Sequence, residues 1–540
     1  MLPKTAKLQQ KVLDRNFQRL LTLESTVKTL EKLVSELQVE NATLNEKVSQ
    51  QEALILKYQS MLFGSKSEKN LPATSAHTTV VKEIGELTPD EPSPRPKGQR
   101  GQRRGAPGHG RRLYEELPPR EVIHELPASE RQCPSCGKSY LECGTEDSTT
   151  IEWEVHIRRV IHKRVKYLHG CDCHTPVMLT APAAPKLLPK GLLEVSAISN
   201  LIVNKFLHSQ PINRQLRELE LLCGVRFSPG TLVGVQEKVA TLLRPLYQAI
   251  LLHLREADHW HADETRWMQY ADENKHRWWL WVFASSDAVA FVLDPSRSRA
   301  VPRRVFGLDD PLENARRAMG IVSCDRWKSY QGIPGIETAY CWTHVRRDFI
   351  DLAKSYPRRL GEWSHIWVKR IATLYHLNDQ RLHYQPGTKD FRQADARLRD
   401  HVAALARLRE TEAADQSLLL EARKALDSMA RHWEGLTLFL DHPDVPLDNN
   451  EAERLLRIGV VGRKNFYGCG SGKSGELMES AYSVLLTTIK HNLNPLTYLR
   501  AYLDACAENG GNPPEDIDRF LPWNASKEDL AAWKLPPLAV

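Results

Sequence analysis

Two aspartates stand where strand-borne carboxylates can hold catalytic metal ions. Asp263 lies within a short strand expected at 259–267, in the run His-Ala-Asp-Glu-Thr, and Asp325 ends a strand expected at 320–325. Carboxylates on neighbouring strands can hold a pair of Mg²⁺ ions about 3.5–4 Å apart, which stabilise the attacking and leaving oxygens of an in-line phosphoryl displacement. Among 67 acidic residues such a pair is not specific by itself. The prediction therefore depends on the positions of both residues on strands.

A third acid is expected on a later helix that begins near Asp448. Residues 448–450 are N-cap candidates for that helix because they are Asp, Asn and Asn. Glu451 and Glu453 are two positions apart and point to different helix faces, so at most one of them can reach a metal shared with Asp263 and Asp325. These residues alone do not choose between the two glutamates, since Glu453 could equally pair with Arg457 one turn later.

The elements around these acids follow the order of an RNase H-like α/β domain. Strands are expected at 259–267, 277–284, 289–293, 320–325 and 337–342, with helical segments at 301–306, 327–330 and 344–354. This meander would place Asp263 on the first strand and Asp325 on the neighbouring fourth. The segment 356–440 is rich in Leu, Ala, Arg and Glu at helical spacing, which predicts a helical insertion. Whether the insertion only braces the core or also contacts DNA stays open.

Ten cysteines in 540 residues are too few for a disulfide scaffold, and five of them lie between positions 133 and 173, which indicates a metal site in a reducing cytosol. The cysteines pair as C-x-x-C and C-x-C, namely Cys133 with Cys136 and Cys171 with Cys173. Four such ligands suit a closed, structural Zn²⁺ site. His169 or His174 could replace one thiolate, and the alternative is a set of reduced cysteines without metal. Between the pairs, the alternation of apolar and polar residues in 151–167 is typical of a hairpin.

The N-terminal segment carries a heptad pattern. Leucine recurs every seven residues at Leu23, Leu30, Leu37 and Leu44, and the second seam is Leu20, Val27, Val34, Asn41 and Val48. Val at one seam and Leu at the other favour a parallel two-stranded coiled coil, and the single polar Asn41 fixes the register at a cost in stability. The sequence therefore predicts a homodimer. The alternative is an amphipathic helix that packs against its own chain.

A basic linker follows the heptads. Seven cations and no acid lie in 95–112, namely Arg95, Lys97, Arg100, Arg103, Arg104, Arg111 and Arg112, and they equal the formal net charge of +7 of the whole chain. A segment so rich in Gly, Pro and charge cannot form a core. Arginine on a flexible backbone suits phosphate contacts or a narrow minor groove. The alternative is a solvated linker whose charge only aids solubility.

Three helices are expected between the cysteines and the acids, at 192–206, 211–222 and 229–254. The second and third flank a turn at Gly224, which is compatible with a helix-turn-helix DNA-binding unit or with ordinary helical packing. The N-terminus lacks the apolar core of a signal peptide, and no run of about 18 apolar residues occurs. A soluble, non-secreted protein without membrane contact is expected.

Several motifs together resemble the transposases of the insertion-sequence-66 family. They are His-Ala-Asp263-Glu-Thr, Ser-Cys-Asp325-Arg-Trp, Cys341-Trp-Thr-His344, Asp448-Asn-Asn-x-x-Glu453-Arg and Gly462-Arg-Lys-Asn465. The resemblance implies a DDE triad of Asp263, Asp325 and Glu453 that binds two Mg²⁺ ions. It also implies that Cys341 and His344 form the Cys-x-x-His element that many such transposases carry, for which a purely structural role is the alternative.

The resemblance has further implications for partners and location. It implies that the protein binds double-stranded DNA at the transposon ends and at the target, and that it forms a homodimer or higher oligomer. It also implies small accessory proteins of the same element as partners, and a location in the bacterial cytoplasm in association with the nucleoid. The Cys171-x-Cys173 spacing departs from the C-x-x-C more usual in the family. The segment 468–474 is not expected to bind ATP, because Tyr467 occupies the position that a phosphate-binding loop requires to be Gly.

The chain is thus predicted to be a multidomain α/β protein. Its 41% apolar and 26% charged residues are ordinary for globular domains and exclude wholesale disorder. The predicted parts are a coiled coil at 1–69, a basic linker at 70–130, a zinc module at 131–180, a helical region at 181–255, an RNase H-like core at 256–355 and 446–510 with a helical insertion at 356–445, and a tail at 511–540. Two rival functions are a non-catalytic zinc-containing DNA-binding regulator and a nuclease that cuts without joining.

Overall fold

The computed structural model describes residues 15, 22–43, 47–48, 51, 157–168, 178–271, 276–309 and 320–536. The chain divides into two compact units, Met1–Pro72 with Tyr247–Val484 and Ala73–Leu246 with Leu485–Val540. The predicted zinc ligands and the cations of the basic linker lie outside the described residues, namely Cys133, Cys136, Cys171, Cys173, Arg95, Lys97, Arg100, Arg103, Arg104, Arg111 and Arg112. None of the helices described is long and apolar enough to cross a membrane.

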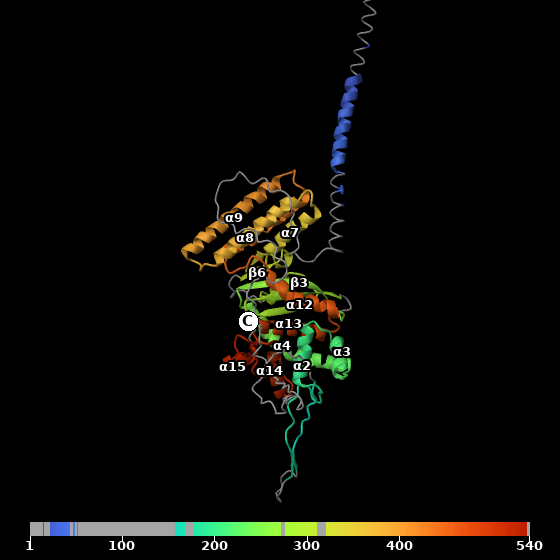
Figure 1. Cartoon of the computed structure of the whole chain (residues 1–540), viewed down its shortest axis with the longest axis vertical. Helices are drawn as coiled ribbons and strands as arrows, with labels where there is room; N and C mark the ends of the chain where they lie inside the picture. The colour runs from blue at the N-terminus through green and yellow to red at the C-terminus, as the bar shows by residue number, and fades with distance from the viewer. Residues whose placement is uncertain are drawn as a thin grey trace, which may run out of the picture. The chain divides into compact units, whose positions relative to one another are not determined.

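A five-stranded sheet forms the centre of the first unit, in the order β5-β4-β3-β6-β7 (Figure 1). The strands are β3 (His259–Met268), β4 (Arg277–Ala284), β5 (Val289–Asp294), β6 (Gly320–Cys324) and β7 (Ile336–Tyr340). The first three are antiparallel, whereas β6 pairs in parallel with both β3 and β7. The predicted strands are confirmed close to their expected bounds. The predicted pairing of the first strand with the fourth is confirmed as well.

The two faces of β3 contact different helices. Helix α12 (Asn450–Phe466) packs against β3 and β4, and its Arg463 donates a hydrogen bond to Thr265 Oγ1 on β3. Because side chains alternate along a strand, Asp263 shares the face of Thr265. On the opposite face, Trp260 contacts Phe306 at the end of α5 (Ala300–Val305), with ring centroids 4.5 Å apart.

A glycine lets α12 approach the sheet. A Cβ atom added at Gly459 would lie only 2.8 Å from Leu280 Cδ2 on β4, so any larger residue would push the helix away from the strands. The first turn of α12 carries Glu453, whose charge acts on Asp263 of β3.

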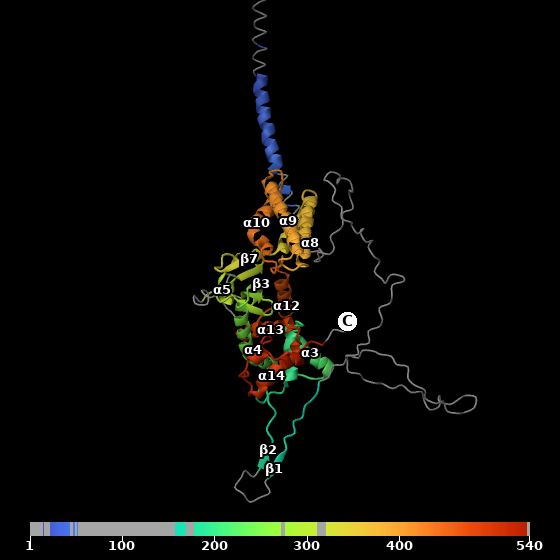
Figure 2. The same ribbon diagram turned by 90° about the vertical axis from the view of Figure 1, so that its left-hand side faces the viewer.

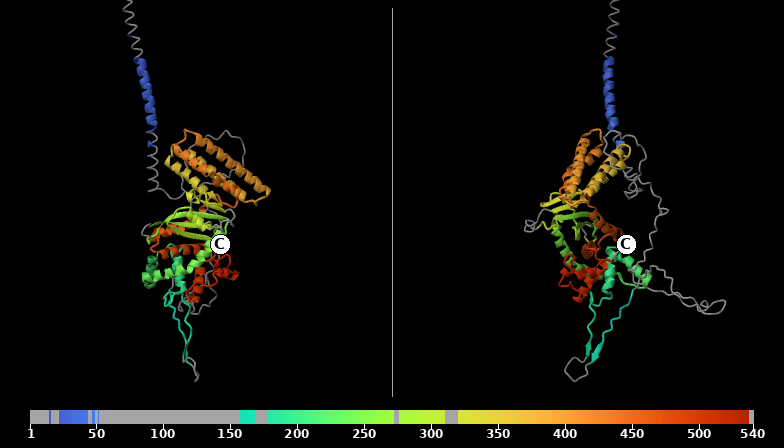
Figure 3. Two further views of the ribbon diagram at one scale, coloured as in Figure 1. Left: turned by 180° about the vertical axis from the view of Figure 1, so that it is seen from behind. Right: turned by 60° about the vertical axis from the view of Figure 1, so that its left-hand side comes forward.

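The segment between β7 and α12 is helical, which includes the insertion predicted at 356–445 (Figures 1 and 3). Its helices are α7 (Trp342–Ser355), α8 (Gly361–Leu382), α9 (Lys389–Ala414), α10 (Leu420–Arg431) and α11 (Trp433–Thr437). They share one apolar core in which the rings of Phe349 and Trp367 stack 5.2 Å apart. The fully buried Arg381 closes this core by an ion pair of 3.0 Å to Asp395 and a hydrogen bond to the Phe439 carbonyl. Since α7 begins directly after β7, the insertion is anchored to the sheet.

The second unit contains the three helices predicted before the sheet. They are α2 (Val195–Phe206), α3 (Ile212–Cys223) and the beginning of α4 (Pro229–Arg255), with Gly224 in the left-handed conformation that ends α3. Helix α14 (Pro495–Glu508) packs against α2. Tyr502 on α14 donates a hydrogen bond of 2.6 Å to the Leu242 carbonyl on α4. Part of the C-terminal segment packs here too, because the Trp533 ring stacks on that of Phe520.

The predicted hairpin is displaced along the chain. Strand β1 (Lys166–Leu168) pairs antiparallel with β2 (Met178–Thr180) (Figure 2), whereas residues 157–165 form no strand. Val160 and Ile161 in that segment are exposed by more than half. An alternating pattern becomes a stable strand only when its apolar face is covered, and these side chains have no such cover in the single chain.

The predicted N-terminal helix is present over 22–43. Its seam residues are exposed in the single chain, with exposed fractions of 60% for Leu23, 57% for Leu30 and 55% for Leu37. A continuous apolar stripe of this kind is stable in water only when another surface covers it.

Candidate metal-dependent active site

The strand register brings Asp263 and Asp325 side by side. In the parallel pair of β3 and β6, His261 lies opposite Ser323. Continuing this register by two residues places Asp263 opposite Asp325, on strands that run about 4.8 Å apart. Each carboxylate accepts a backbone hydrogen bond, from Glu264 N to Asp263 Oδ1 at 2.8 Å and from Trp327 N to Asp325 Oδ1 at 2.9 Å. These bonds orient both carboxylates at the end of β6.

The environment of Asp263 is unfavourable to its negative charge. Its pKa is raised from 3.8 to about 8, first because the carboxyl is buried and then because of the charges of Glu264, Asp325 and Glu453. Without a metal ion, the neighbouring carboxylates repel one another. A bound cation would relieve this repulsion. The electrostatics thus fit a divalent cation at this position.

The structure separates the two glutamates of α12. Glu453 Oε1 lies 3.7 Å from His344 Nε2, and its charge is one of those that raise the pKa of Asp263. Glu451 Oε2 lies instead 3.6 Å from His261 Nε2. Glu453 is therefore the glutamate on the side of the two aspartates, and its ion-pair partner is a histidine of α7 rather than Arg457.

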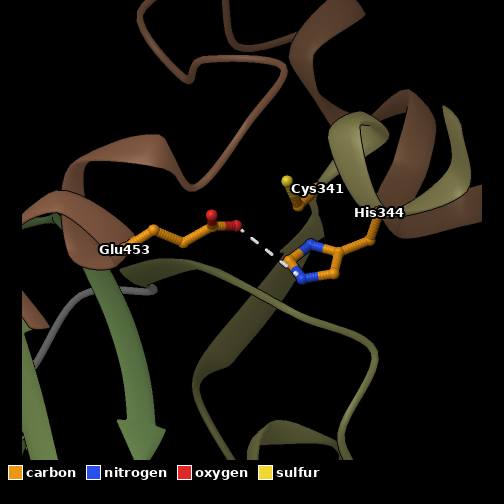
Figure 4. Close-up of side chains that lie close together, drawn as sticks. All are labelled: Cys341, His344 and Glu453. Atoms are coloured by element: carbon orange, nitrogen blue, oxygen red, sulfur yellow. Dashed lines mark ion pairs between the residues drawn. The ribbon is translucent and has the colours of Figure 1, made fainter. Parts of the chain in front are cut away.

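Cys341, His344 and Glu453 form a compact cluster at the start of α7 (Figure 4). One possible ligand atom from each residue lies within 4.8 Å of the other two. Among the described residues, no other group of three or more His, Cys, Asp or Glu side chains is this compact. His344 Nδ1 and Glu453 Oε1 are buried, and neither has a hydrogen-bond partner among the described residues. Two orphaned polar atoms beside a thiol are the donor set of a metal site. The possible ligand atoms of Asp263, Asp325 and Glu453 do not all lie within this distance of one another. Carboxylates that hold two metal ions can lie further apart, because they flank both ions.

Cys341 connects the insertion to the beginning of α12. The residue precedes α7, and its sulfur accepts a hydrogen bond from the backbone N–H of Asn449 at 3.3 Å. Burial raises the pKa of the Cys341 thiol. The next residue, Trp342, donates its backbone N–H to the Leu447 carbonyl at 2.9 Å. These contacts support a structural role for Cys341 in holding the segment that leads to Glu453.

Asn449 was missed as a site residue, because the sequence indicated only an N-cap. It occupies the N-cap position of α12, but its side chain makes no capping bond. Instead Nδ2 donates to the Ala262 carbonyl at 2.7 Å, and Oδ1 lies 3.0 Å from His261 Nδ1. The Asn449 carbonyl also accepts from Glu453 N at 3.2 Å. This single residue, which is 1% exposed, joins β3, α12 and Cys341.

Glu264 is a second residue whose role the sequence did not reveal. Its fully buried side chain accepts a hydrogen bond from Tyr330 at 2.5 Å and pairs with Arg297 Nε at 2.7 Å. Arg297 in turn lies over the ring of Trp327, with its guanidinium carbon 3.7 Å from the ring centroid. Glu264 therefore ties β3 to the segment after Asp325, and its charge is the largest electrostatic cause of the raised Asp263 pKa.

Asp263→Asn is expected to stabilise the metal-free protein at alkaline pH. The folded protein keeps a proton on Asp263 up to a pKa of about 8, while in the unfolded chain this carboxyl has its ordinary value of 3.8. Stability is therefore lost as the pH rises between these two values, by as much as ~1.4 kcal/mol for each step of one pH unit. The amide cannot ionise and removes this loss.

The measurement is the denaturation midpoint of both proteins at pH 5 and pH 8 in metal-free buffer. The gain of the variant over the wild type should be several degrees larger at pH 8 than at pH 5. Added Mg²⁺ should narrow the gap at pH 8, because only the wild type binds it fully. An equal difference at both pH values would contradict the electrostatic explanation.

Comparison with known proteins adds independent information. A sequence model of the family described as "Transposase IS66 family" matches residues 190–477, which is more than half of the chain and includes Asp263, Asp325 and Glu453. The uncharacterized protein y4jD of Sinorhizobium fredii is 25% identical over 495 residues, which cover 86% of this chain and 92% of the relative. The uncharacterized protein y4hP of the same organism is 24% identical over 436 residues, or 76% of each chain.

Proposed function

Because this chain belongs to the IS66 family of transposases, we propose that it binds transposon ends and carries out metal-dependent cleavage and transfer of DNA strands. The observation that carries this proposal is the buried Asp263, whose pKa is raised to about 8 beside Asp325 and Glu453. The order of the sheet, an antiparallel meander continued by two parallel strands, supports an RNase H-like catalytic core. Carboxylates on its neighbouring strands suit phosphoryl transfer.

Asp263, Asp325 and Glu453 would hold two Mg²⁺ ions, whose preferred ligands are carboxylate oxygens. When bound, the ions would activate water or a 3′-hydroxyl and stabilise the leaving 3′-oxygen of the DNA. The carboxylates act as ligands rather than nucleophiles. Asn449 and Cys341 are positioning residues, since their hydrogen bonds hold the start of α12 against β3 and α7.

The soft donors Cys341 and His344 fit a transition metal better than Mg²⁺, so we assign them an accessory role beside Glu453. The structural zinc of the four cysteines Cys133, Cys136, Cys171 and Cys173 remains part of the proposal. The proposal also includes DNA contacts by the basic linker and a helix-turn-helix formed by α3 and α4. It further includes accessory proteins of the same element and a location at the nucleoid in the cytoplasm.

The experiment that tests this function uses the full-length chain, DNA that carries the terminal repeats bracketing its gene, and Mg²⁺. Cleavage at the ends, followed by joining of a pre-cut end to target DNA, is expected. Cleavage without joining would favour a nuclease. If the protein binds the ends but never cuts them, and substituting all three acids by amides changes nothing, a non-catalytic regulator is the better description.

The exposed heptads support a parallel dimer. Asn41 is the single polar residue of its seam, and two such amides facing each other fix the register at a cost in stability. Asn41→Val is expected to tighten self-association and to broaden its stoichiometry beyond two chains. Sedimentation equilibrium of the full-length protein measures both effects. Lys28→Gln, on the outer face of the helix, is the matched control and should leave the dimer unchanged. A wild-type monomer at micromolar concentration would contradict the dimer.

A further inference from the structure

A cavity of about 560 Å³ lies between the segment that follows Asp325 and the end of α10. Arg326, Lys328, Arg431 and His432 line it together with polar groups that include Gln331 and Tyr340, and none of the described side chains that line it is acidic. A volume of this size is in the range of sites that bind small ligands. The cavity therefore combines space with a positive lining.

Two of its cations have no counter-charge in the part of the chain that the structure describes. They are Lys328, in the short helix η3 (Lys328–Tyr330), and Arg431, the last residue of α10, and both are exposed. Neither makes an ion pair with any described residue. Arg326 differs, because it pairs with Asp348 at 2.6 Å and is thereby largely neutralised. The excess positive charge of the cavity thus comes from Lys328 on the sheet side and from Arg431 on the insertion.

The polar groups of the cavity are already held in place. His432 Nδ1 lies 2.7 Å from the Ser428 carbonyl, and its ring packs edge-on against Tyr340 with centroids 4.8 Å apart. Gln331 Nε2 lies 3.4 Å from His432 Nε2, so these two side chains hold each other in place. Two uncompensated cations at such a preformed site are suited to an oxygen-rich anion.

One cation of the cavity is close to the candidate metal site along the chain. Lys328 follows Asp325 by three residues, so their Cα atoms are at most about 11 Å apart. Each DNA strand carries one phosphate per about 3.4 Å of helix axis, so a strand that runs from Asp325 toward Lys328 brings a phosphate within reach of this cation. The acids repel the phosphates, and an uncompensated cation at this distance would offset part of that repulsion.

We propose that this cavity binds backbone phosphates of the DNA strand that enters the site of Asp263, Asp325 and Glu453. Lys328 and Arg431 supply the charge, and Gln331 and Tyr340 line the cavity beside them. The inference rests on the proposed function and extends it, because Arg431 and His432 belong to the helical insertion. The insertion then contributes directly to DNA binding in addition to bracing the core.

The test is the salt dependence of DNA binding by the full-length chain. The probe is a duplex oligonucleotide with a single-stranded 3′ extension, and fluorescence anisotropy gives Kd over a series of KCl concentrations without Mg²⁺. For the double variant Lys328→Gln/Arg431→Gln, the slope of log affinity against log salt should fall by about 1.4–1.8, since each lost phosphate contact contributes about 0.7–0.9. Affinity should fall roughly tenfold or more at low salt.

The matched control is Arg392→Gln/Lys424→Gln, which removes two exposed cations from α9 and α10 that do not line the cavity. Its slope should equal that of the wild type. An unchanged slope in the cavity variant, an equal loss in both variants, or no DNA binding by the wild type would overturn the proposal. A thermal midpoint near that of the wild type shows that the cavity variant is folded.

Inorganic phosphate distinguishes the source of the anion. If the cavity binds DNA, phosphate should compete no better than a chloride solution of equal ionic strength. Competition that exceeds this at millimolar phosphate in the wild type and disappears in the cavity variant would assign the site to a free anion instead. Because the readout is binding, the result is independent of catalysis. If the cavity variant shows the expected slope change and the wild type binds DNA but never cuts it, the transposase mechanism is refuted and the cavity assignment stands.

Discussion

Asp263→Asn is expected to reduce Mg²⁺-dependent strand cleavage by at least ~10³-fold while DNA affinity stays within a few-fold of the wild type, since lost transition-state charge stabilisation of several kcal/mol has this effect on rate. The amide is nearly identical in size, but it lacks the charge and one of the two acceptor oxygens that a metal ligand needs. Cleavage of an end-labelled duplex, followed over time at several Mg²⁺ concentrations, measures the loss.

Two further variants distinguish loss of a metal ligand from loss of any acid. Glu453→Gln should be as defective as Asp263→Asn, because Glu453 lies on the side of the two aspartates. Glu451→Gln is the matched control, only two positions away but directed at His261, and should retain most of the activity. Retained cleavage in Asp263→Asn, or an equal loss in both glutamate variants, would remove the basis of the proposed mechanism.

Asn449→Ala is expected to reduce the free energy of unfolding of its unit by about 2–4 kcal/mol, because a buried donor or acceptor left without its partner costs about 1–3 kcal/mol. The substitution removes the hydrogen bonds that Asn449 makes to His261 Nδ1 and to the Ala262 carbonyl. Both adjoin Asp263 on β3. The substitution therefore loosens the start of α12 relative to the strand that carries the first acid.

Cleavage should decline beyond what the loss of stability explains. Below the unfolding transition, where both proteins are folded, Asn449→Ala should need several-fold more Mg²⁺ for half-maximal cleavage, because Glu453 is no longer held toward the aspartates. Denaturant unfolding and a Mg²⁺ titration of activity measure the two effects separately. Asn450→Ala, the neighbouring amide, should change neither. A purely structural role for Asn449 would lower stability and leave the Mg²⁺ requirement unchanged.

Much of the fold could be predicted because it depends on local pattern. The run of bulky apolar residues in β4 is buried in the sheet, and apolar runs of this length are typical of central strands. The helical insertion followed from its periodicity. The hairpin after the first cysteine pair was displaced, because alternation at 157–165 says nothing about whether another layer covers its apolar side chains.

The candidate site could be predicted only in part. The motifs indicated which acids to consider, and the family motif pointed to Glu453, but helix spacing alone leaves Glu451 and Glu453 equal. Their separation depends on what surrounds α12, with His261 on one side and His344 on the other. The cavity cations come from two segments about a hundred positions apart in the chain, and no local pattern connects them.

By itself, the sequence determined the elements of this protein, the acids they carry and the family they resemble, since helix and strand periodicity and motif spacing are properties of neighbouring residues. Only the tertiary structure decided which glutamate faces the aspartates, which residue fastens α12 to β3, and where uncompensated positive charge lies beside Asp325. His261 and Asn449 are 188 positions apart, yet they share a hydrogen bond. Burial, pKa shifts and buried hydrogen bonds depend on distance in space, which the order of residues along the chain does not specify.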